Sequence, residues 1–332
     1  MHLAHHHGGD SRARGHAALS LEAPYASLDP DCVLDAVSAC GLWPDGRLLA
    51  LNSYENRVWQ VGIEDAAPVI AKFYRPHRWS DAAILEEHAF AKELADAEVP
   101  MVAPLLFGGR SLLHHEGFRY ALTPRRGGRA PSLESPEQLS WLGRLIARMH
   151  SVGARQPFAH RGRIDRTTLI EQPTRAVLAS SLLPPSLHDA YRHAAARVDQ
   201  AVAARLEAVG PVRPLRLHGD CHPGNVLWTD AGPHFVDLDD ARMGPAVQDL
   251  WMLANDDAGM EALLDGYQQM RDFDFSELAL VPALRAMRQL HYAGWIATRW
   301  HDPAFPAAFP FVAEPRWWEQ HIADLHELAD AL

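Results

Sequence analysis

Residues 217–228 read LHGDCHPGNVLW, and two of their polar side chains have types and a spacing that suit phosphoryl transfer. Asp220 precedes Asn225 by five positions. A carboxylate can orient an acceptor hydroxyl and take its proton, and an amide oxygen can ligate Mg²⁺ without adding charge. Phosphoryl transfer needs both roles, because the acceptor must be aligned with the phosphorus atom and metal ions must neutralise the triphosphate.

The same spacing occurs in the catalytic loop of kinases, where a further carboxylate completes the metal site. After Asn225 the chain reads VLWTDAGPHFVDLDDA, which we interpret as a hairpin around the turn residues TDAGP. A hairpin returns its second strand beside the start of its first, so Asp237 is expected close to Asn225. We therefore predict that Asp220 and Asp237 are catalytic and that Asn225 and Asp237 ligate the metal.

A cation for the nucleotide phosphates is expected earlier in the chain. Lys72 lies inside the apolar run PVIAKFY, where a lysine is uncommon unless it is paired. Its partner is expected on the following helix, which offers both Glu86 and Glu87. Glu87 shares a helical face with apolar residues, so we predict that it points inward and pairs with Lys72.

A glycine-rich phosphate loop is expected between the first two strands, but the turn LNSYENRVW contains no glycine. The hydroxyl of Ser53 and a nest of backbone N–H groups from Tyr54 to Asn56 could contact phosphates instead. Tyr54 could equally pack on the surrounding lobe. Adenine is expected at the joint between lobes, against backbone groups of residues 120–124.

Other polar residues near the motif have more than one interpretation. Asp249 precedes an apolar helical run, so it either caps a helix or reaches back to brace the amides of the catalytic loop. His222 could contact phosphate or have a structural role. A zinc site made of His218, Cys221 and His222 is a weaker alternative, because this spacing resembles no common structural site.

The elements that must position these residues fall into two parts with different patterns. Strand signals dominate before residue 124, helical periodicity dominates after it, and a Gly- and Pro-rich stretch at 125–135 separates them. We predict strands near residues 47–53, 56–63, 68–74, 111–115 and 118–124, and helices near residues 29–41, 80–98, 135–153, 186–210 and 280–300.

The predicted fold is α+β and bilobal, like that of protein kinases. Residues 24–124 would form a small N-lobe built on an antiparallel sheet, which binds the nucleotide. Residues 125–332 would form a larger, mainly helical C-lobe, which carries the catalytic and substrate-binding groups. Residues 1–23 are expected to be a disordered tail, although their His5–His7 cluster could instead bind a metal.

Composition limits the possible partners and the compartment. The formal net charge of −11 over 332 residues argues against a nucleic-acid partner, because phosphate backbones are bound by Lys and Arg. Three cysteines offer no disulfide framework and suit a reducing compartment. No signal peptide and no apolar run of membrane-spanning length is apparent. We therefore expect a cytoplasmic protein, without a membrane partner, that is a monomer.

The joined motifs resemble a known family. The loop HGDCHPGN followed by VDLDDA resembles the aminoglycoside phosphotransferase and choline kinase-like branch of the protein-kinase fold. Within this branch, the similarity is greatest to a family of bacterial serine/threonine protein kinases that act in stress response, and it runs from about residue 28 to 320. The segments that carry it are LNSYENRVWQ, AKFYRP, ILEEH, LRLHGDCHPGN, FVDLDDARMGPAVQDLWML, LRAMR and DPAFP.

The resemblance implies a bilobal kinase that uses ATP and Mg²⁺ to phosphorylate Ser or Thr of proteins, itself included. It assigns the proton acceptor to Asp220, the magnesium ligands to Asn225 and Asp237, and an ATP contact to Ser53. Two alternatives stay open. One is a small-molecule kinase acting on a hydroxyl of an amino alcohol or aminoglycoside, which the same fold allows. The other is a nucleotide-binding regulator without turnover, against which the intact set of these residues and Lys72 argues.

Overall fold

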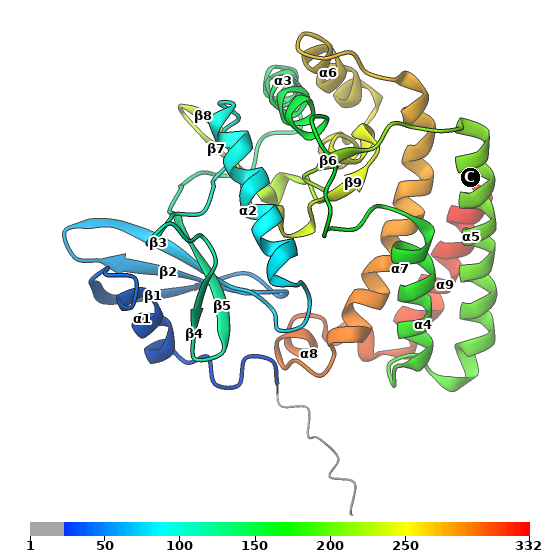
Figure 1. Cartoon of the computed structure of the whole chain (residues 1–332). Coiled ribbons are helices and arrows are strands. Elements are labelled where there is room, and N and C mark those ends of the chain that lie inside the picture. The colour runs from blue at the N-terminus through cyan, green and yellow to red at the C-terminus, as the bar shows by residue number, and fades with distance from the viewer. Residues whose placement is uncertain (1–22) are drawn as a thin grey trace, which may run out of the picture.

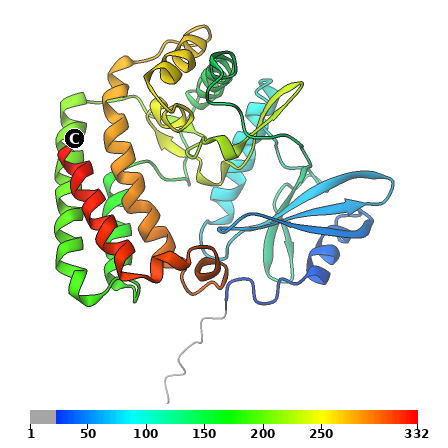
Figure 2. The ribbon, with the colours of Figure 1, turned by 180° about the vertical axis from the view of Figure 1, so that it is seen from behind.

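The structure is a computed structural model that describes residues 23–332. The predicted tail and its His5–His7 cluster lie outside the described residues, apart from Ala23. Figure 1 shows that a sheet and a larger helical part lie side by side, and Figure 2 shows the same arrangement from behind. The predicted α+β class, with a small antiparallel sheet beside a larger helical part, is confirmed.

The sheet has five strands in the order β1-β2-β3-β5-β4, and every neighbouring pair is antiparallel. Glu116 and Gly117 join the last two strands and both have positive φ, as a tight two-residue turn requires. Its strands are β1 (Pro44–Leu51), β2 (Arg57–Ile63), β3 (Ala66–Phe73), β4 (Leu113–His115) and β5 (Phe118–Pro124).

Two small two-stranded sheets lie in the helical part. The first pairs β6 (Leu215–Leu217) with β9 (Arg242–Gly244), and the second is the hairpin of β7 (Val226–Thr229) and β8 (Gly232–Phe235). These four strands frame the loops that contain the polar motif. The predicted hairpin after Asn225 is therefore present, although its second strand ends at Phe235.

Nine α-helices occur among residues 23–332, and the predicted ones are all present. They are α1 (Pro30–Ser38), α2 (Asp81–Asp96), α3 (Pro136–Gly153), α4 (Gln172–Ala179), α5 (His188–Val209), α6 (Asp257–Gln268), α7 (Val281–Arg299), α8 (Ala304–Ala308) and α9 (Pro315–Asp330). Short helical turns are η1 (Thr167–Glu171), η2 (Pro185–Leu187), η3 (Pro223–Asn225), η4 (Leu238–Asp240), η5 (Ala246–Asp249), η6 (Trp251–Leu253), η7 (Phe275–Leu280) and η8 (Pro310–Ala313).

Side-chain caps explain where two of these helices begin. Ser80 accepts the N–H of Ala83 at the start of α2, and Ser135 accepts the N–H of Gln138 at the start of α3. The reciprocal bond of a capping box, from the Ser135 N–H to the Gln138 side chain, is absent at α3. The N–H of Ser135 already donates to the carbonyl of Ser132, and the Gln138 side chain accepts the N–H of Ser132 instead.

Helix α2 connects the cores of the two parts. Its first half packs in a small cluster that joins Ile84 to Tyr74 after β3, and its second half places Phe90 and Leu94 in the large core of the helical part. The opposite face of the sheet is covered by α1 in a separate core. A residue midway along α2, such as Glu87, is therefore held between the sheet and the helical part.

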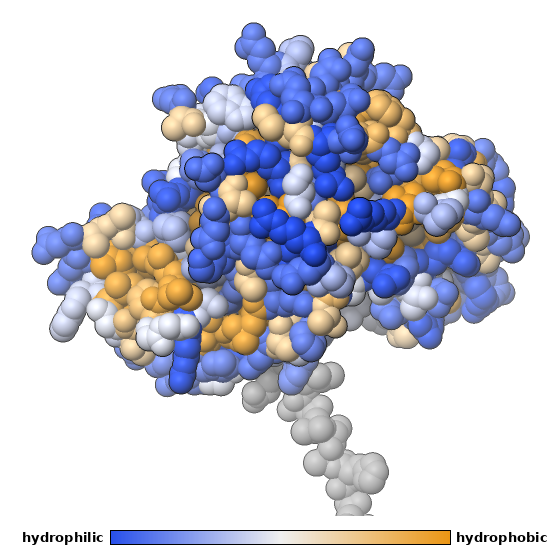
Figure 3. All heavy atoms as spheres, turned by 45° about the horizontal axis from the view of Figure 1, so that its top comes forward, coloured by the Kyte–Doolittle hydropathy of each residue, from blue (hydrophilic) through white to orange (hydrophobic). Residues whose placement is uncertain are grey.

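No helix among residues 23–332 is long and apolar enough to cross a membrane. On the face seen in Figure 3, polar side chains cover much of the helical part, and an apolar area is exposed over the sheet part. Large apolar side chains exposed on the sheet include Leu49 and Leu51 of β1.

Candidate active site

Lys72 lies where the sheet meets the helical part. Its Nζ is 2.9 Å from an Asp237 carboxylate oxygen, 3.3 Å from one of Asp239 and 3.5 Å from one of Glu87. Lys72 comes from β3, Glu87 from α2, and both aspartates from the segment that follows β8. Elements far apart in the sequence thus bring three carboxylates around one ammonium group.

The structure distinguishes the two adjacent glutamates on α2. Glu87 is 6% exposed and lies between Lys72 and Arg161, whose Nη1 is 3.2 Å from its Oε2. Glu86 does not contact Lys72 but accepts backbone N–H groups of the loop before η1, including those of His160 at 2.9 Å and Arg161 at 3.0 Å. Glu86 therefore holds a loop, and Glu87 holds Lys72.

Charge around Lys72 keeps it protonated. Burial alone would lower the pKa of its amine, but the neighbouring carboxylates of Asp237, Asp239 and Glu87 outweigh burial and raise that pKa well above its usual value. Burial raises the pKa of Glu87, although the charges of Lys72 and Arg161 oppose this. A permanent cation held by a carboxylate from α2 is suited to binding phosphate oxygens.

The hairpin of β7 and β8 brings Asn225 and Asp237 together. Val226 pairs with Phe235, and the N–H of Val236 donates to the Asn225 carbonyl at 3.1 Å. The Asn225 side-chain amide donates to the carbonyl of Asp220 at 2.9 Å, which leaves its Oδ1 available as a ligand. Asp237 lies two residues after the end of β8 and has φ 64°, a left-handed conformation at the start of η4.

The pair of Asn225 and Asp237 fits a magnesium ion. Oxygen atoms are the ligands that Mg²⁺ prefers, and it is commonly held by one or two carboxylates together with substrate phosphates. The Asp237 side chain is 48% exposed, so one of its oxygens can turn toward a bound ion while Lys72 contacts the other. The amide of Asn225 is already oriented by its own hydrogen bond, as a metal ligand usually is.

Asp220 has basic partners on both of its oxygens. Oδ1 accepts a hydrogen bond from Arg288 of α7 at 2.7 Å, and Oδ2 lies 3.5 Å from Nε2 of His222. Burial opposes ionisation, but the hydrogen bond from His222 and the charge of Arg288 outweigh it and hold the pKa of Asp220 below its usual value. Asp220 is therefore an ionised carboxylate at neutral pH.

Asp249 braces the loop that carries Asp220. It is the last residue of η5, and the N-cap of the following turn η6 is Leu250, so the helix-cap interpretation is wrong. Its buried carboxylate accepts the N–H of His218 at 2.8 Å and that of Gly219 at 2.9 Å, and it lies 3.1 Å from Nε2 of His150. The loop's backbone is fixed to the core of the helical part through this one side chain.

The Asp249→Asn variant should be markedly less stable than the wild type. Its amide nitrogen would face one of the two backbone donors, and leaving a buried donor unsatisfied costs about 1–3 kcal/mol. With the buried His150 also deprived of its partner, we expect a total loss of roughly 2–5 kcal/mol in the free energy of unfolding by urea. Asp265→Asn on the exposed face of α6 is the control, and equal stability of the two variants would contradict the bracing role.

Glu277 supports the same region and makes stability depend on pH. It lies on η7 and accepts the N–H of Val247 in η5 at 2.8 Å. Burial raises the pKa of Glu277 from 4.5 to about 7. Between these values the folded chain keeps a proton that the unfolded chain has lost, so this contribution to stability is present below pH 4.5 and is lost as the pH rises to 7.

A neutral amide at this position removes that pH dependence. The Glu277→Gln variant keeps an acceptor oxygen for Val247, and we expect it to exceed the wild type in stability by roughly 1–3 kcal/mol at pH 8. Near pH 4.5 the two proteins should differ little. Urea unfolding at both pH values measures this, and a constant difference between the proteins would show that Glu277 does not titrate as proposed.

Ser53 and the sheet face beside Lys72 form the remaining part of the site. Ser53 lies in the loop of residues 52–56 between β1 and β2, and it is half-buried. Leu51 aligns with Val58 and, across the next strand pair, with Lys72, so these side chains lie on one face of the sheet. Leu49 lies two residues before Leu51 and adds to this apolar face.

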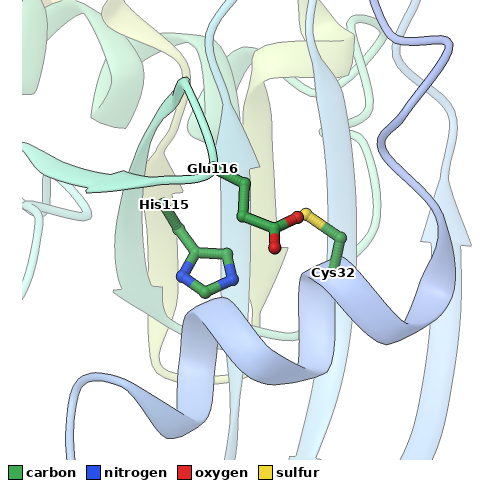
Figure 4. A group of neighbouring side chains, drawn as sticks. All are labelled: Cys32, His115 and Glu116. Carbon is green, nitrogen blue, oxygen red and sulfur yellow. The ribbon is translucent and has the colours of Figure 1, made fainter.

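The zinc alternative is not supported by the geometry. His218, Cys221 and His222 do not bring three ligand atoms within metal-binding distance, and burial raises the pKa of the Cys221 thiol well above its usual value. Among residues 23–332 only Cys32, His115 and Glu116 do so, at α1 and the β4–β5 turn (Figure 4). Burial and the neighbouring Glu116 raise the pKa of Cys32 to about 11, so this thiol is protonated and does not favour a metal.

Sequence reasoning missed several charged partners in the site. Arg288 contacts Asp220, while Arg78 from the loop after β3 pairs with both Asp239 and Asp240. The spacing of arginines in LRAMR could have indicated that they follow one face of a helix. Nothing in the sequence indicates which remote carboxylate each arginine meets.

Comparison with known proteins agrees with this site. The model of a family described as "Phosphotransferase enzyme family" matches residues 47–290. Stress response kinase A of Escherichia coli K12 is 43% identical over 313 residues, which cover 93% of this chain and 94% of that protein. The serine/threonine protein kinase RdoA of Salmonella typhimurium LT2 is 42% identical over 308 residues, covering 91% and 93% respectively.

A solved structure of low sequence identity has the same fold as this chain. The amicoumacin kinase hAmiN, in complex with AMP-PNP, Ca²⁺ and Ami, has a TM-score of 0.70 at 18% identity and covers 91% of this chain and 94% of its own. The matched range of the family model spans the whole site from Ser53 to Arg288. This chain, similar over most of its length to stress response kinases, therefore belongs to the phosphotransferase enzyme family, and it is a phosphotransferase with a hydroxyl acceptor.

Proposed function

We propose that this chain is a serine/threonine protein kinase that uses ATP and Mg²⁺, phosphorylates itself as well as other proteins, and acts in a bacterial stress response. The observation that carries the proposal is the convergence of Lys72, Asn225 and Asp237 beside Asp220, in a chain 43% identical to stress response kinase A. We further propose that it acts in the cytoplasm as a monomer.

The two parts divide the work between them. Residues 24–124 are proposed to hold the nucleotide, with Lys72 on its phosphates, Glu87 orienting Lys72, and Ser53 contacting the phosphates from the loop between β1 and β2. Residues 125–332 are proposed to supply the catalytic groups and the acceptor site. Mg²⁺ would be held by Asn225 and Asp237, where it would neutralise charge on the phosphates.

The adenine ring is proposed to lie on the apolar face of the sheet. Leu49 and Leu51 are exposed there, on the same face as Lys72, so a planar ring can cover apolar surface while its phosphates reach the amine. The end of β5 borders this face, because Lys72 pairs with Ala121 and Ile70 with Thr123. Backbone groups of residues 120–124 are then near enough to bind the ring edge.

Asp220 is proposed to take the proton of the acceptor hydroxyl. It is ionised, it is held by a rigid loop, and it is linked through its own carbonyl to the side chain of Asn225. A serine or threonine hydroxyl that enters the site must share Asp220 with Arg288, whose side chain is 46% exposed and free to move aside.

The same arginine weighs against a cationic small acceptor. An amino alcohol or aminoglycoside would bring a positive charge close to the guanidinium of Arg288, and like charges at such distances repel. The amicoumacin kinase shares the fold at 18% identity, which does not carry its acceptor over to this chain. A protein acceptor is therefore favoured.

A mixed acceptor panel tests the proposal. The protein is incubated with γ-labelled ATP and Mg²⁺, alone, with a casein-like protein, or with choline, homoserine and an aminoglycoside. We expect label on serine or threonine of protein, including the kinase itself, and none on the small molecules. Transfer to a small molecule in preference to protein would overturn the acceptor assignment, and nucleotide binding without any transfer would favour a regulator.

A further inference from the structure

The loop of residues 52–56 between β1 and β2 is held in an unusual way for a phosphate-binding loop without glycine. Its backbone carbonyls accept hydrogen bonds from two arginines, Arg57 at the start of β2 and Arg75 in the segment after β3. The carbonyl of Tyr54 accepts from Arg57 at 3.2 Å and from Arg75 at 3.1 Å, and that of Glu55 accepts from Arg75 at 2.9 Å. The loop therefore has a defined backbone orientation.

Peptide geometry then fixes the direction of the N–H groups. In a trans peptide the N–H of one residue points opposite to the carbonyl of the residue before it. With the carbonyls of Tyr54 and Glu55 directed at Arg75, the N–H groups of Glu55 and Asn56 point away from that arginine. Within residues 23–332 neither N–H has an acceptor in the protein.

The contacts of Tyr25 identify the face of the sheet toward which these N–H groups point. Tyr25 donates to the carbonyls of both Glu55 and Phe73, and it lies in the core under α1. Lys72 precedes Phe73 by one residue in β3, so its side chain is on the opposite face. The free N–H groups are thus directed to the face of the sheet on which Lys72 meets Asp237.

A single carboxylate in the helical part holds both arginines. Asp302 lies between α7 and α8 and is 1% exposed. Its two oxygens are 2.7 and 2.9 Å from Nη2 of Arg57, and one of them is 2.6 Å from Nη2 of Arg75. In the sequence, Asp302 lies 245 positions after Arg57 and 227 positions after Arg75.

The loop has a further anchor in the same region. The Glu55 carboxylate accepts the indole N–H of Trp295 and pairs with Arg299, both on α7. The ring of Tyr54 contacts Phe309 edge to face with 5.1 Å between centroids. The Tyr54 side chain thus packs against the helical part, and its backbone carbonyl is bound by Arg57 and Arg75.

We propose that Asp302 is a positioning residue for the nucleotide phosphates: through Arg57 and Arg75 it holds the loop so that the N–H groups of Glu55 and Asn56, with the hydroxyl of Ser53, face the phosphate site. In other phosphate loops, glycine lets the backbone turn its N–H groups toward the phosphates. Here the hydrogen bonds to the helical part would hold the backbone in that orientation instead. This inference rests on the proposed use of ATP at Lys72, but it concerns only which residue orders the loop.

The Asp302→Asn variant tests the inference by comparison of nucleotides. Titrations of the full chain with ATP, ADP, AMP and adenosine are followed by calorimetry in the presence of Mg²⁺. We expect affinity for ATP to fall about tenfold or more, because charge-assisted hydrogen bonds that order the loop are lost, while affinity for adenosine is unchanged. KM for ATP should rise more than kcat falls, and Asp302→Glu should restore part of the affinity.

Two further variants keep the result unambiguous. Arg57→Ala removes one arm of the connection at a partly exposed position, so it decides the matter if Asp302→Asn does not fold, and it should weaken ATP binding but not adenosine binding. Asp199→Asn breaks the pair of Asp199 with Arg166 away from the site and should leave all four nucleotides unaffected. Equal losses for ATP and adenosine, or none, would overturn the inference, whereas a wild type that binds no ATP would overturn the proposed function instead.

Discussion

The Asp237→Asn variant is expected to lose Mg²⁺-dependent nucleotide binding and phosphoryl transfer together. Asp237 is the one negatively charged residue of the proposed metal pair, and it lies 2.9 Å from Lys72. Without its charge the ion is held only by neutral ligands and phosphates, and metal catalysis of this kind contributes several kcal/mol, so we expect transfer to fall by about 10³-fold. Asparagine is preferred to alanine because it tolerates the left-handed φ of 64°.

Calorimetry with a non-hydrolysable ATP analogue, with and without Mg²⁺, measures the binding part of this prediction, and label transfer measures the rate. The matched control is Asp230→Asn at the exposed turn of the same hairpin, which should behave like the wild type. If Asp237→Asn kept the magnesium dependence of the wild type, the metal assignment would be wrong.

The Asp220→Asn variant is expected to separate binding from chemistry. Nucleotide affinity should be unchanged, because Asp220 lies beside the metal pair and contacts it only through its backbone carbonyl. Transfer should fall by about 10²–10⁴-fold, the range for loss of a general base. Asparagine keeps the size of the side chain and its acceptor oxygen for Arg288, so the surrounding loop should be retained.

The rate constant of a single turnover with saturating Mg²⁺ and ATP is the appropriate measurement, since it excludes product release. Asp230→Asn serves again as the matched loss of one carboxylate from the same region. A transfer rate close to that of the wild type would exclude Asp220 as the proton acceptor, and weakened nucleotide binding would indicate a structural role for it.

The part of the site that could be predicted from sequence is the part that is local in the chain. Asp220, Asn225 and Asp237 fall within one loop and hairpin, and a two-stranded hairpin leaves little freedom in where its ends meet. Glu87 was separable from Glu86 because adjacent residues of a helix project in different directions, and only Glu87 falls on the apolar face. These predictions needed no knowledge of tertiary packing.

The part that could not be predicted depends on contacts between remote elements. Arg288 reaches Asp220 from α7, and Asp302 reaches Arg57 and Arg75 across more than two hundred residues. Each of these side chains reads in the sequence as an ordinary surface charge. Only the packing of the helical part against the sheet determines which charges meet, and local propensities carry no information about it.

Competition between local hydrogen-bond partners also limited what the sequence could predict. Asp249 could cap a helix or brace a loop, and the choice was made by the nearby N–H groups of His218 and Gly219, which the sequence does not place. At the start of α3, no full capping box forms, because Ser132 accepts the N–H of Ser135 and donates its own N–H to the Gln138 side chain. In each case a backbone donor had more than one possible partner.

The most direct test of the central claim is a structure of the chain with Mg²⁺ and a non-hydrolysable ATP analogue. The metal should lie about 2.1 Å from Oδ1 of Asn225 and from an Asp237 oxygen, with a phosphate oxygen within hydrogen-bond distance of Lys72 Nζ. Asp220 should face the terminal phosphate from the acceptor side. A nucleotide bound elsewhere, with Lys72 still paired to Asp237 and Asn225 without a metal, would contradict the account.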